Sequence, residues 1–332
     1  MKLFGDQNFG FGCMRLPMKD GQVDIEQMNE MVDTFMADGF CYFDTAHGYL
    51  GGKSETALKT CLTDRYPRDS YILTDKLTNF FFKKARAYET AFELKKEGKI
   101  RHVGISFHDK AAVLEQILTE YPQIEVVQIQ FNYLDYDDPA VESGKCLEVC
   151  RKHGKPVIVM EPVKGGSLVN LPEDAAAVLD ALDGGSPASY ALRYVAGFDG
   201  IRMILSGMGS IEQMQDNLSF MKGAKPLNDT ETEAVHKVCE ILRSKNLISC
   251  TACRYCTEGC PKQISIPDLF ACMNAKTAFH DWNADYYYNE VHTKRGGRAS
   301  DCIQCGLCEK ACPQHLPIRK LLEEVAAEFE NR

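Results

Sequence analysis

The 332-residue sequence lacks three features that would each have indicated a particular class of protein. It has no run of about 20 apolar residues, so we expect no membrane span. It has no excess of basic residues: the formal net charge is −9, which argues against nucleic acid or an anionic membrane as the partner. Its first residues lack the cationic and apolar segments of a signal peptide, so we expect a cytoplasmic protein.

Cysteine, by contrast, is abundant, with 15 residues. Disulfides are not expected without an export signal. Seven cysteines are scattered through mostly apolar patterns, where a free cysteine usually serves as a small core residue. These seven are Cys13, Cys41, Cys61, Cys146, Cys150, Cys239 and Cys272.

The other eight cysteines form two groups near the C-terminus, each with the pattern C-x2-C-x2-C-x3-C-P. Three thiolates at two-residue gaps can surround one face of a four-iron–four-sulfur cluster, and the fourth, before the proline, reaches the other cluster. We therefore expect two 4Fe-4S clusters. The first set of ligands is Cys250, Cys253, Cys256 and Cys312. The second set is Cys260, Cys302, Cys305 and Cys308.

Zinc is the alternative, because C-x2-C pairs also bind zinc. Zinc needs only four ligands per site, which leaves the repeated x3-C-P extension without a reason. Residues 250–332 hold little apolar sequence, as in small modules where a cofactor substitutes for a core. A purely structural role, in which the module staples the C-terminus to the rest, is the alternative to electron transfer.

From residue 9 to about 220, short β-rich runs alternate with amphipathic helical stretches, which implies parallel strands and helical crossovers. So many repeats favour a closed (β/α)8 TIM barrel over an open doubly wound sheet. We count seven strands, and one helical segment, 81–98, between the third and fourth, so the barrel is expected to be one βα unit short. The predicted strands are Phe9–Arg15, Tyr42–Ala46, Tyr71–Lys76, His102–Phe107, Val126–Tyr133, Pro156–Glu161 and Met203–Ser206.

Several barrel segments resemble the aldo/keto reductase family. Phe43–Tyr49 (FDTAHGY), followed by Lys53–Glu55 and Thr74–Lys76, resembles the family signature, and Gly98–Ser106 (GKIRHVGIS) resembles its segment along a central strand. The resemblance covers residues 9–220. With the cysteine motifs, the whole chain resembles the branch that carries a C-terminal 4Fe-4S ferredoxin-type domain.

The resulting fold prediction is an α/β barrel followed by a mainly helical, ferredoxin-like two-cluster module. We expect the barrel over 1–225, a linker helix over 226–249 and the iron–sulfur domain over 250–332. Asp24 and Asp109 are predicted to cap two barrel helices at their N-termini.

The resemblance implies that Asp44, Tyr49 and Lys76 are catalytic. Carbonyl reduction requires hydride at carbon and a proton at oxygen, and Tyr49 would be the general acid. A tyrosine with a pKa of about 10 is a poor donor at neutral pH, so Lys76 is expected to tune it, held by Asp44. All three fall at or just after strand ends, where barrel active sites lie. The alternative is an exposed salt bridge beside a surface tyrosine.

A nucleotide site is also implied. Gly207 and Gly209 lead into a helix for which Ser210 and Gln213 form a predicted capping box, and exposed N–H groups at a helix start suit a phosphate. A plain helix cap is the alternative. By resemblance, the contacts to NAD(P)H would be Ser106, Gln128, Gly207, Ser210 and Asn217.

One departure from the family concerns its catalytic histidine, which belongs on the barrel strand that is absent here. No histidine lies between Lys76 and His102. His47 and His108 are the nearby candidates to replace it.

Three further departures concern the nucleotide. Phe107 replaces an asparagine, Met160 replaces the aromatic residue that stacks on nicotinamide, and Gly207 and Gln213 replace the basic residues that bind a 2′-phosphate. NAD, a flavin or no nucleotide therefore remain alternatives to NADP. Because a cluster moves one electron and a nicotinamide moves a hydride, coupling them normally requires a flavin, for which the sequence has no signal.

We predict an iron–sulfur oxidoreductase that reduces a carbonyl or related small molecule, with electrons relayed by the clusters and a protein electron donor or acceptor as partner. The alternative is a non-catalytic electron-transfer or redox-responsive binding protein that uses the barrel as a scaffold.

Overall fold

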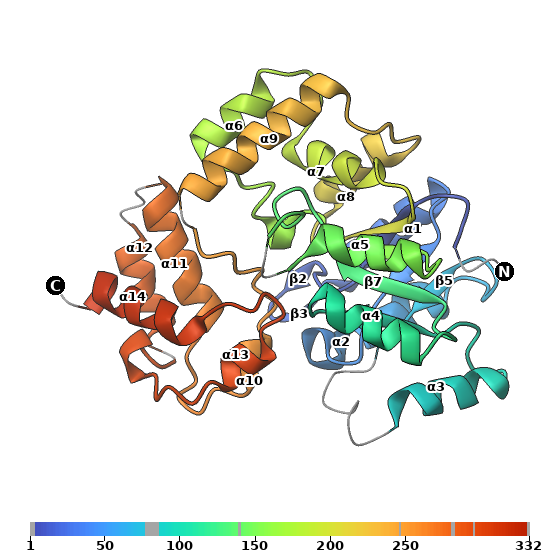
Figure 1. The fold of residues 1–332 in the computed structure, drawn as a ribbon, viewed down its shortest axis with the longest axis horizontal. Coiled ribbons are helices and arrows are strands. Elements are labelled where there is room, and N and C mark those ends of the chain that lie inside the picture. Colours follow the sequence, from blue (N-terminus) through green and yellow to red (C-terminus); the bar gives the residue numbers. More distant parts are fainter. Residues whose placement is uncertain are drawn as a thin grey trace.

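The computed structural model describes residues 4–76, 86–138, 141–245, 247–279, 283–294 and 296–330. Seven parallel strands form one curled sheet in the order β5-β4-β1-β9-β8-β7-β6, which confirms the predicted barrel-like α/β fold with seven strands (Figure 1). In the described chain, β5 and β6 are the two edges of this sheet. The strands are β1 (Phe9–Gly12), β4 (Tyr42–Asp44), β5 (Ile72–Thr74), β6 (Gly104–Phe107), β7 (Val126–Gln130), β8 (Val157–Met160) and β9 (Ile201–Ser206).

The observed strands lie within or overlap all seven predicted ranges, and most are shorter at their ends. A small antiparallel hairpin, β2 (Met18–Lys19) with β3 (Gln22–Val23), was not predicted. The segment 77–85, which includes the start of the helix predicted over 81–98, lies outside the described residues.

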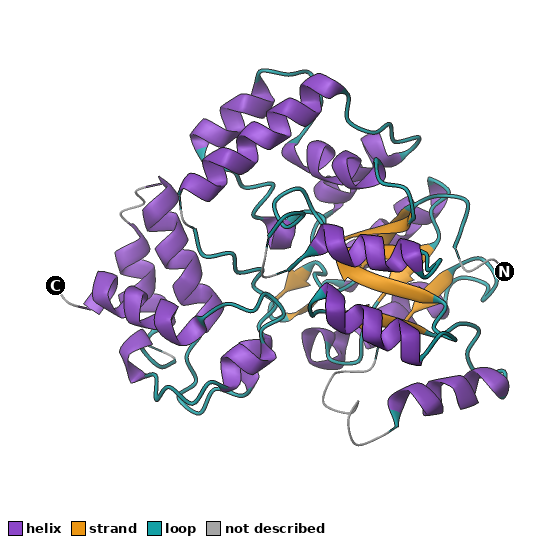
Figure 2. Cartoon of the chain, in the orientation of Figure 1, coloured by secondary structure: helices purple, strands orange, loops and turns teal. Residues whose placement is uncertain are grey.

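Helices cover the sheet (Figure 2). Asp24 caps the first of them as predicted, because its side chain accepts from the backbone N–H of Gln27 at 3.1 Å. The prediction for Asp109 was wrong: its carboxylate accepts from the adjacent N–H of Lys110, so the helix begins one residue later, with Lys110 at the cap. The barrel helices are α1 (Ile25–Ala37), α2 (Lys53–Leu58), α3 (Ala87–Lys96), α4 (Ala111–Glu120), α5 (Ser143–Lys152), α6 (Glu173–Asp180), α7 (Pro187–Ala196) and α8 (Ile211–Met221). A further helix, α9 (Asp229–Ser244), lies within the segment predicted as the linker helix and packs against α6 and α7.

The core between the strands β1 and β4 and the helix α1 is aromatic. Phe9 and Phe11 on β1 pack against Phe35 of α1, and Phe11 also packs against Phe43 of β4, with ring centroids 5.8 to 6.1 Å apart. All four residues of β1 are buried, as expected for a parallel strand covered on both faces. Six of the seven scattered cysteines are buried and Cys41 is half-buried.

The C-terminal module is mainly helical and lies beside the barrel (Figure 1). It has a hydrophobic core of its own, in which Tyr288 stacks on Phe329 with ring centroids 4.5 Å apart, beside Leu269, Phe270 and Val325. The expectation of little apolar core was wrong, because these side chains are spread over helices far apart in sequence. The module helices are α10 (Tyr255–Glu258), α11 (Ile266–Phe279), α12 (Asn283–Tyr286), α13 (Leu307–Ala311) and α14 (Ile318–Glu330).

Short 3₁₀ and π turns complete the described secondary structure. They are η1 (Tyr49–Gly52), η2 (Lys59–Thr63), η4 (Lys164–Gly166), η5 (Tyr287–His292) and η6 (Ala299–Asp301). Among the described residues, no helix has both the length and the apolar character needed to cross a membrane.

Candidate functional site

The structure brings the three predicted catalytic residues together at the carboxyl ends of β4 and β5. Asp44 ends β4, Lys76 follows β5, and Tyr49 begins η1. The Lys76 ammonium donates to the Asp44 carboxylate and, at 2.7 Å, to the backbone oxygen of Thr45. Its Nζ also lies 5.1 Å from the centroid of the Tyr49 ring. Asp44 is 2% exposed, so this is a buried ion pair beside a tyrosine and not a surface salt bridge.

The electrostatics of Tyr49 differ from the expectation. Burial raises the pKa of Tyr49, and the charges of Asp44 and Glu161 raise it further, with Arg15 opposing them. The Lys76 ammonium, which was expected to lower this pKa, lies over the ring and is paired with Asp44. Tyr49 therefore keeps its proton at neutral pH.

A second charged pair, which the sequence analysis missed, lies next to Tyr49. Arg15 Nη1 is 3.7 Å from Glu161 Oε1. Glu161 follows β8 with a backbone φ of 56°, a conformation that is uncommon for a non-glycine residue. Burial raises the pKa of Glu161, opposed by Arg15. The signal that could have found Glu161 is its place as the last residue of a predicted barrel strand.

The two candidate histidines differ in position. His47 Nδ1 lies 3.0 Å from Glu55 Oε2 and its side chain is 66% exposed. His108, just after β6, has its Nε2 3.3 Å from the Ser106 hydroxyl. Burial lowers the pKa of His108 to about 4, with the charges of Lys76 and His315 adding to the effect. His108 is thus a neutral imidazole within electrostatic reach of Lys76.

The residues expected at the phosphate end of a nucleotide are engaged within the chain. Ser210 accepts from the N–H of Gln213 at 3.4 Å, as a helix cap does. The other half of the predicted capping box was wrong: the Gln213 side chain accepts from the N–H of Gly209 at 2.8 Å. The Asn217 amide donates to the hydroxyl of Ser206 at 2.8 Å.

The residues expected at the nicotinamide end are similarly enclosed. Gln128 is 5% exposed, and the hydroxyl of Ser106 lies 3.8 Å from the sulfur of Met160. A Cβ on Gly207 would lie 3.7 Å from Cβ of Arg15. These five residues stay predicted contacts to a nucleotide.

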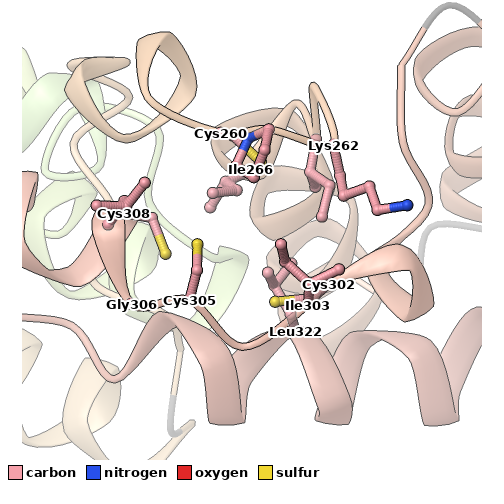
Figure 3. Close-up of a pocket in the computed structure, with 12 residues that line it drawn as sticks. Cys260, Lys262, Ile266, Cys302, Ile303, Cys305, Gly306, Cys308 and Leu322 are labelled. Atoms are coloured by element: carbon pink, nitrogen blue, oxygen red, sulfur yellow. The ribbon is translucent and has the colours of Figure 1, made fainter.

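The two sets of cysteines each line a separate cavity in the module. The second set surrounds one cavity (Figure 3), with an empty volume of ≈ 330 Å³ that includes open solvent. The first set surrounds the other cavity, whose empty volume is ≈ 310 Å³, again including open solvent. Each cavity takes three thiols from one motif and the fourth from the other, which is the crossed arrangement expected from the spacing.

The electrostatic neighbours of the thiols agree with this arrangement. Burial raises the pKa of Cys250 to about 11, and Cys253 and Cys312 raise it further. Burial likewise raises the pKa of Cys256, with Cys253, Cys250 and Cys312 as its charged neighbours. In the described chain no three His, Cys, Asp or Glu side chains are placed to hold a single metal ion. Four thiols around a cavity are the donor set that a 4Fe-4S cluster takes.

The first set lies against the mouth of the barrel. Gln314, two residues after Cys312, exchanges two hydrogen bonds with Gln130 at the end of β7, at 2.6 and 2.9 Å. Gln314 also accepts from the ammonium of Lys164 at 3.5 Å. Lys164 in turn forms an ion pair with Asp135, and both side chains are buried.

Two more contacts hold the same part of the module. Arg15 Nη2 donates to the backbone oxygen of Thr251 at 2.8 Å, and His315 Nε2 lies 3.1 Å from the backbone oxygen of His108. Burial raises the pKa of Tyr255, on α10, and the neighbouring Tyr49 raises it further. These residues were not predicted, because contacts between distant segments leave no local pattern in the sequence.

Comparison with known families agrees with both parts of the chain. A model described as the aldo/keto reductase family matches residues 8–93 and 86–240. A model described as a 4Fe-4S dicluster domain matches residues 249–316. No curated protein matches the sequence.

Solved structures share the barrel fold. An aldo-keto reductase from Klebsiella pneumoniae in complex with NADPH aligns with a TM-score of 0.56 and 20% identity, over 71% of this chain and 93% of that chain. The holo form of aldo-keto reductase AKR11C1 from Bacillus halodurans aligns with a TM-score of 0.53 and 24% identity, over 71% of this chain and 95% of that one. At such identities the likeness shows the fold alone.

Proposed function

The chain belongs to the aldo/keto reductase family and carries a 4Fe-4S dicluster domain, and from this premise we propose that it reduces the carbonyl group of a small molecule, with Tyr49 as the proton donor. The two domains together support an iron–sulfur oxidoreductase. The observation that supports the finer proposal is the placing of Asp44, Lys76 and Tyr49 in one buried group at the carboxyl ends of the strands.

Each residue of this group has a distinct task. Asp44 and the Thr45 carbonyl fix the Lys76 ammonium, which favours negative charge developing on a nearby carbonyl oxygen. The raised pKa of Tyr49 keeps its hydroxyl protonated. Tyr49 can then donate when the carbonyl oxygen becomes an alkoxide, which is a stronger base than a phenolate.

The thiols of both sets fit 4Fe-4S clusters, and the proposal assigns one cluster to each set. When bound, such clusters supply electrons one at a time. Reduction of a carbonyl to an alcohol takes two electrons and two protons: Tyr49 provides the proton at oxygen, and water provides the proton at carbon. Ser106, Gln128, Gly207, Ser210 and Asn217 stay the proposed contacts for NAD(P)H, which the assay below tests as an alternative reductant.

The test is turnover by the intact protein, purified without oxygen and reduced with titanium(III) citrate. Benzaldehyde is offered first, followed by other simple aldehydes and ketones, and alcohol formation is measured by chromatography. Replacing Tyr49→Phe is expected to slow turnover about 10²- to 10⁴-fold, the range for loss of a general acid. The matched control is Tyr287→Phe, at an exposed residue on the module. Equal rates for the two variants would contradict the proposal.

The second candidate is a redox-responsive or electron-transfer protein with the barrel as scaffold. It is favoured by the absence of a histidine between Lys76 and His102 and by the sheet edges at β5 and β6 in the described chain. Repeating the assay with NADH and NADPH separates the two. Clusters that are reduced without alcohol formation from any carbonyl, with any of the three reductants, would favour the scaffold.

A further inference from the structure

The two sets of cysteines face different surroundings. Among the described residues, three from the module make hydrogen bonds to the barrel, and all three lie near ligands of the first set: Thr251 follows Cys250, and Gln314 and His315 follow Cys312. Thr251 and Gln314 are 2% and 4% exposed. The first set is therefore the inner one, next to the candidate active site.

The second set opens toward solvent instead. Cys305 is exposed, and its neighbours Ile303 and Leu307 are 56% and 47% exposed. Figure 3 shows Ile303 beside Cys302 and Cys305 at the edge of this cavity. Single exposed apolar residues are ordinary. Here, however, two exposed apolar residues flank an exposed thiol of a set that fits a cluster. Another protein can approach such a place closely.

Two exposed lysines lie at this edge, although the whole chain is acidic. Of the acids near it, Asp301 accepts from the backbone N–H of Arg298 at 2.8 Å and Glu323 accepts from Gln304 at 3.2 Å. Lys262 lines the same cavity and is exposed, with its side chain extending away from it (Figure 3). Lys310 is exposed and lies three residues after Leu307 on α13, so the two share a helix face. The nearest acid on α13, Glu309, is paired with Arg319 at 2.9 Å. An acidic partner complements this surface.

We propose that the surface formed by Lys262, Ile303, Leu307 and Lys310 around Cys305, here named the docking patch, binds a small acidic one-electron carrier protein. This inference rests on the proposed cluster at each set of thiols. One electron leaves the carrier and is taken up at the second set, with no bond made or broken, and the first set stands between it and the barrel. The order is carrier, second set, first set, active site.

The test follows reduction of the intact, iron-loaded protein and does not depend on any carbonyl substrate. A pre-reduced, acidic plant-type 2Fe-2S ferredoxin is the probe, and the decay of the visible cluster absorbance is recorded by stopped flow. The double variant Ile303→Glu/Leu307→Glu is expected to react with ferredoxin at least about tenfold more slowly, because buried and repelling carboxylates oppose docking. Reduction of the same variant by titanium(III) citrate is expected to be unchanged.

Two controls locate the effect. Tyr286→Glu changes an apolar residue that is 58% exposed on α12, away from α13 in the same module (Figure 1), and is expected to react like the wild type. Lys262→Glu/Lys310→Glu changes only charge, and is expected to slow the ferredoxin reaction and to remove its acceleration at low salt.

The outcomes separate this inference from the proposed function. Wild-type protein that titanium(III) citrate reduces and ferredoxin does not would overturn it, as would equal ferredoxin rates for the wild type and both patch variants. If Ile303→Glu/Leu307→Glu also reacts slowly with titanium(III) citrate, its cluster is disturbed. The ferredoxin rate of Lys262→Glu/Lys310→Glu, compared with that of the wild type, then tests the inference. Failure of carbonyl turnover leaves all these rates unaffected.

Discussion

At the scale of single residues, three buried polar atoms at the strand ends have no hydrogen-bond partner in the described chain. They are Asp44 Oδ2, His108 Nδ1 and Glu161 Oε2. Leaving a buried polar group unpaired costs about 1–3 kcal/mol, and proteins usually tolerate this only where a ligand or water completes the set. Asp44 and Glu161 lie within electrostatic reach of Tyr49, and His108 within reach of Lys76, which supports the barrel mouth as the place where a polar substrate binds.

His108 gives a prediction in pH. Its pKa is about 4 in the folded protein, below the value of about 6.5 for a free histidine. Between these values the unfolded chain binds the proton and the folded chain does not, so stability is full above pH 6.5 and falls as the pH drops toward 4. The loss by pH 4 is about 3 kcal/mol.

Urea unfolding of the wild type and of His108→Asn, measured side by side at several pH values, checks this. The difference between the two curves removes any shared loss of clusters in acid. We expect the variant to lose less stability between pH 6.5 and 4. Parallel curves would show that His108 titrates like a free histidine.

For the catalytic residues, sequence reasoning named Asp44, Tyr49 and Lys76, because they fall in one recognisable segment and at strand ends. The sequence did not show how these three side chains are positioned relative to one another. Whether a lysine near a tyrosine lies at its hydroxyl or over its ring depends on where its charge partner sits, and Asp44 holds Lys76 over the ring. The pKa of Tyr49 rises chiefly because the side chain is buried, and the charges of Asp44 and Glu161 add to the rise.

At the scale of elements, the turn after β8 is shaped by the module that lies on it. Gly165 has a φ of 65°, and a Cβ there would lie 2.6 Å from the backbone oxygen of Thr251. Only glycine permits this approach, because the atom in the way is backbone and cannot rotate aside. The turn η4 and the first cysteine motif therefore fit each other closely.

Replacing Gly165→Ala is expected to displace the loop that carries Cys250 and Cys253, and so to lower both stability and iron content. The matched control is Gly223→Ala, also at positive φ (78°) but with nothing within 4 Å. The control should lose only the backbone strain of about 1–2 kcal/mol. Thermal unfolding and iron analysis of both variants are the measurements, and equal behaviour would refute the close fit.

The strands were predictable because each is a short apolar run of the kind that parallel sheets bury. The ends of the strands were less predictable, because pairing stops where the backbone of the adjacent strand turns away. The start of α4 shows the same limit: Asp109 has the right residue type for a cap, yet its carboxylate binds the next N–H.

At the scale of the whole molecule, the crossed arrangement of the thiols makes a direct prediction. Cys312→Ser removes a ligand of the first set although Cys312 belongs to the second motif, and Cys260→Ser does the reverse. Each variant is expected to keep one cluster and to bind about half the iron of the wild type, provided each 4Fe-4S cluster needs four thiolates.

Which cluster survives is the informative result. The barrel contacts of Gln314 and Thr251 lie beside the first set, so Cys312→Ser should increase hydrogen exchange at the end of β7, and Cys260→Ser should not. Paramagnetic resonance of the reduced variants, recorded with the exchange data, is the measurement. Loss of the same cluster in both variants would rule out the crossed sets.

The sequence by itself determined the strands of the barrel, the eight thiols and their division into two sets, because these depend on spacings within about a dozen residues. Only the tertiary structure decided that the first set faces the barrel, that Arg15 and Glu161 join Tyr49, and that Cys305 lies at the surface. Burial and charge at a site are set by segments more than a hundred residues apart, such as Gln130 and Gln314. No local pattern records such contacts, since they arise only when the helices and strands pack.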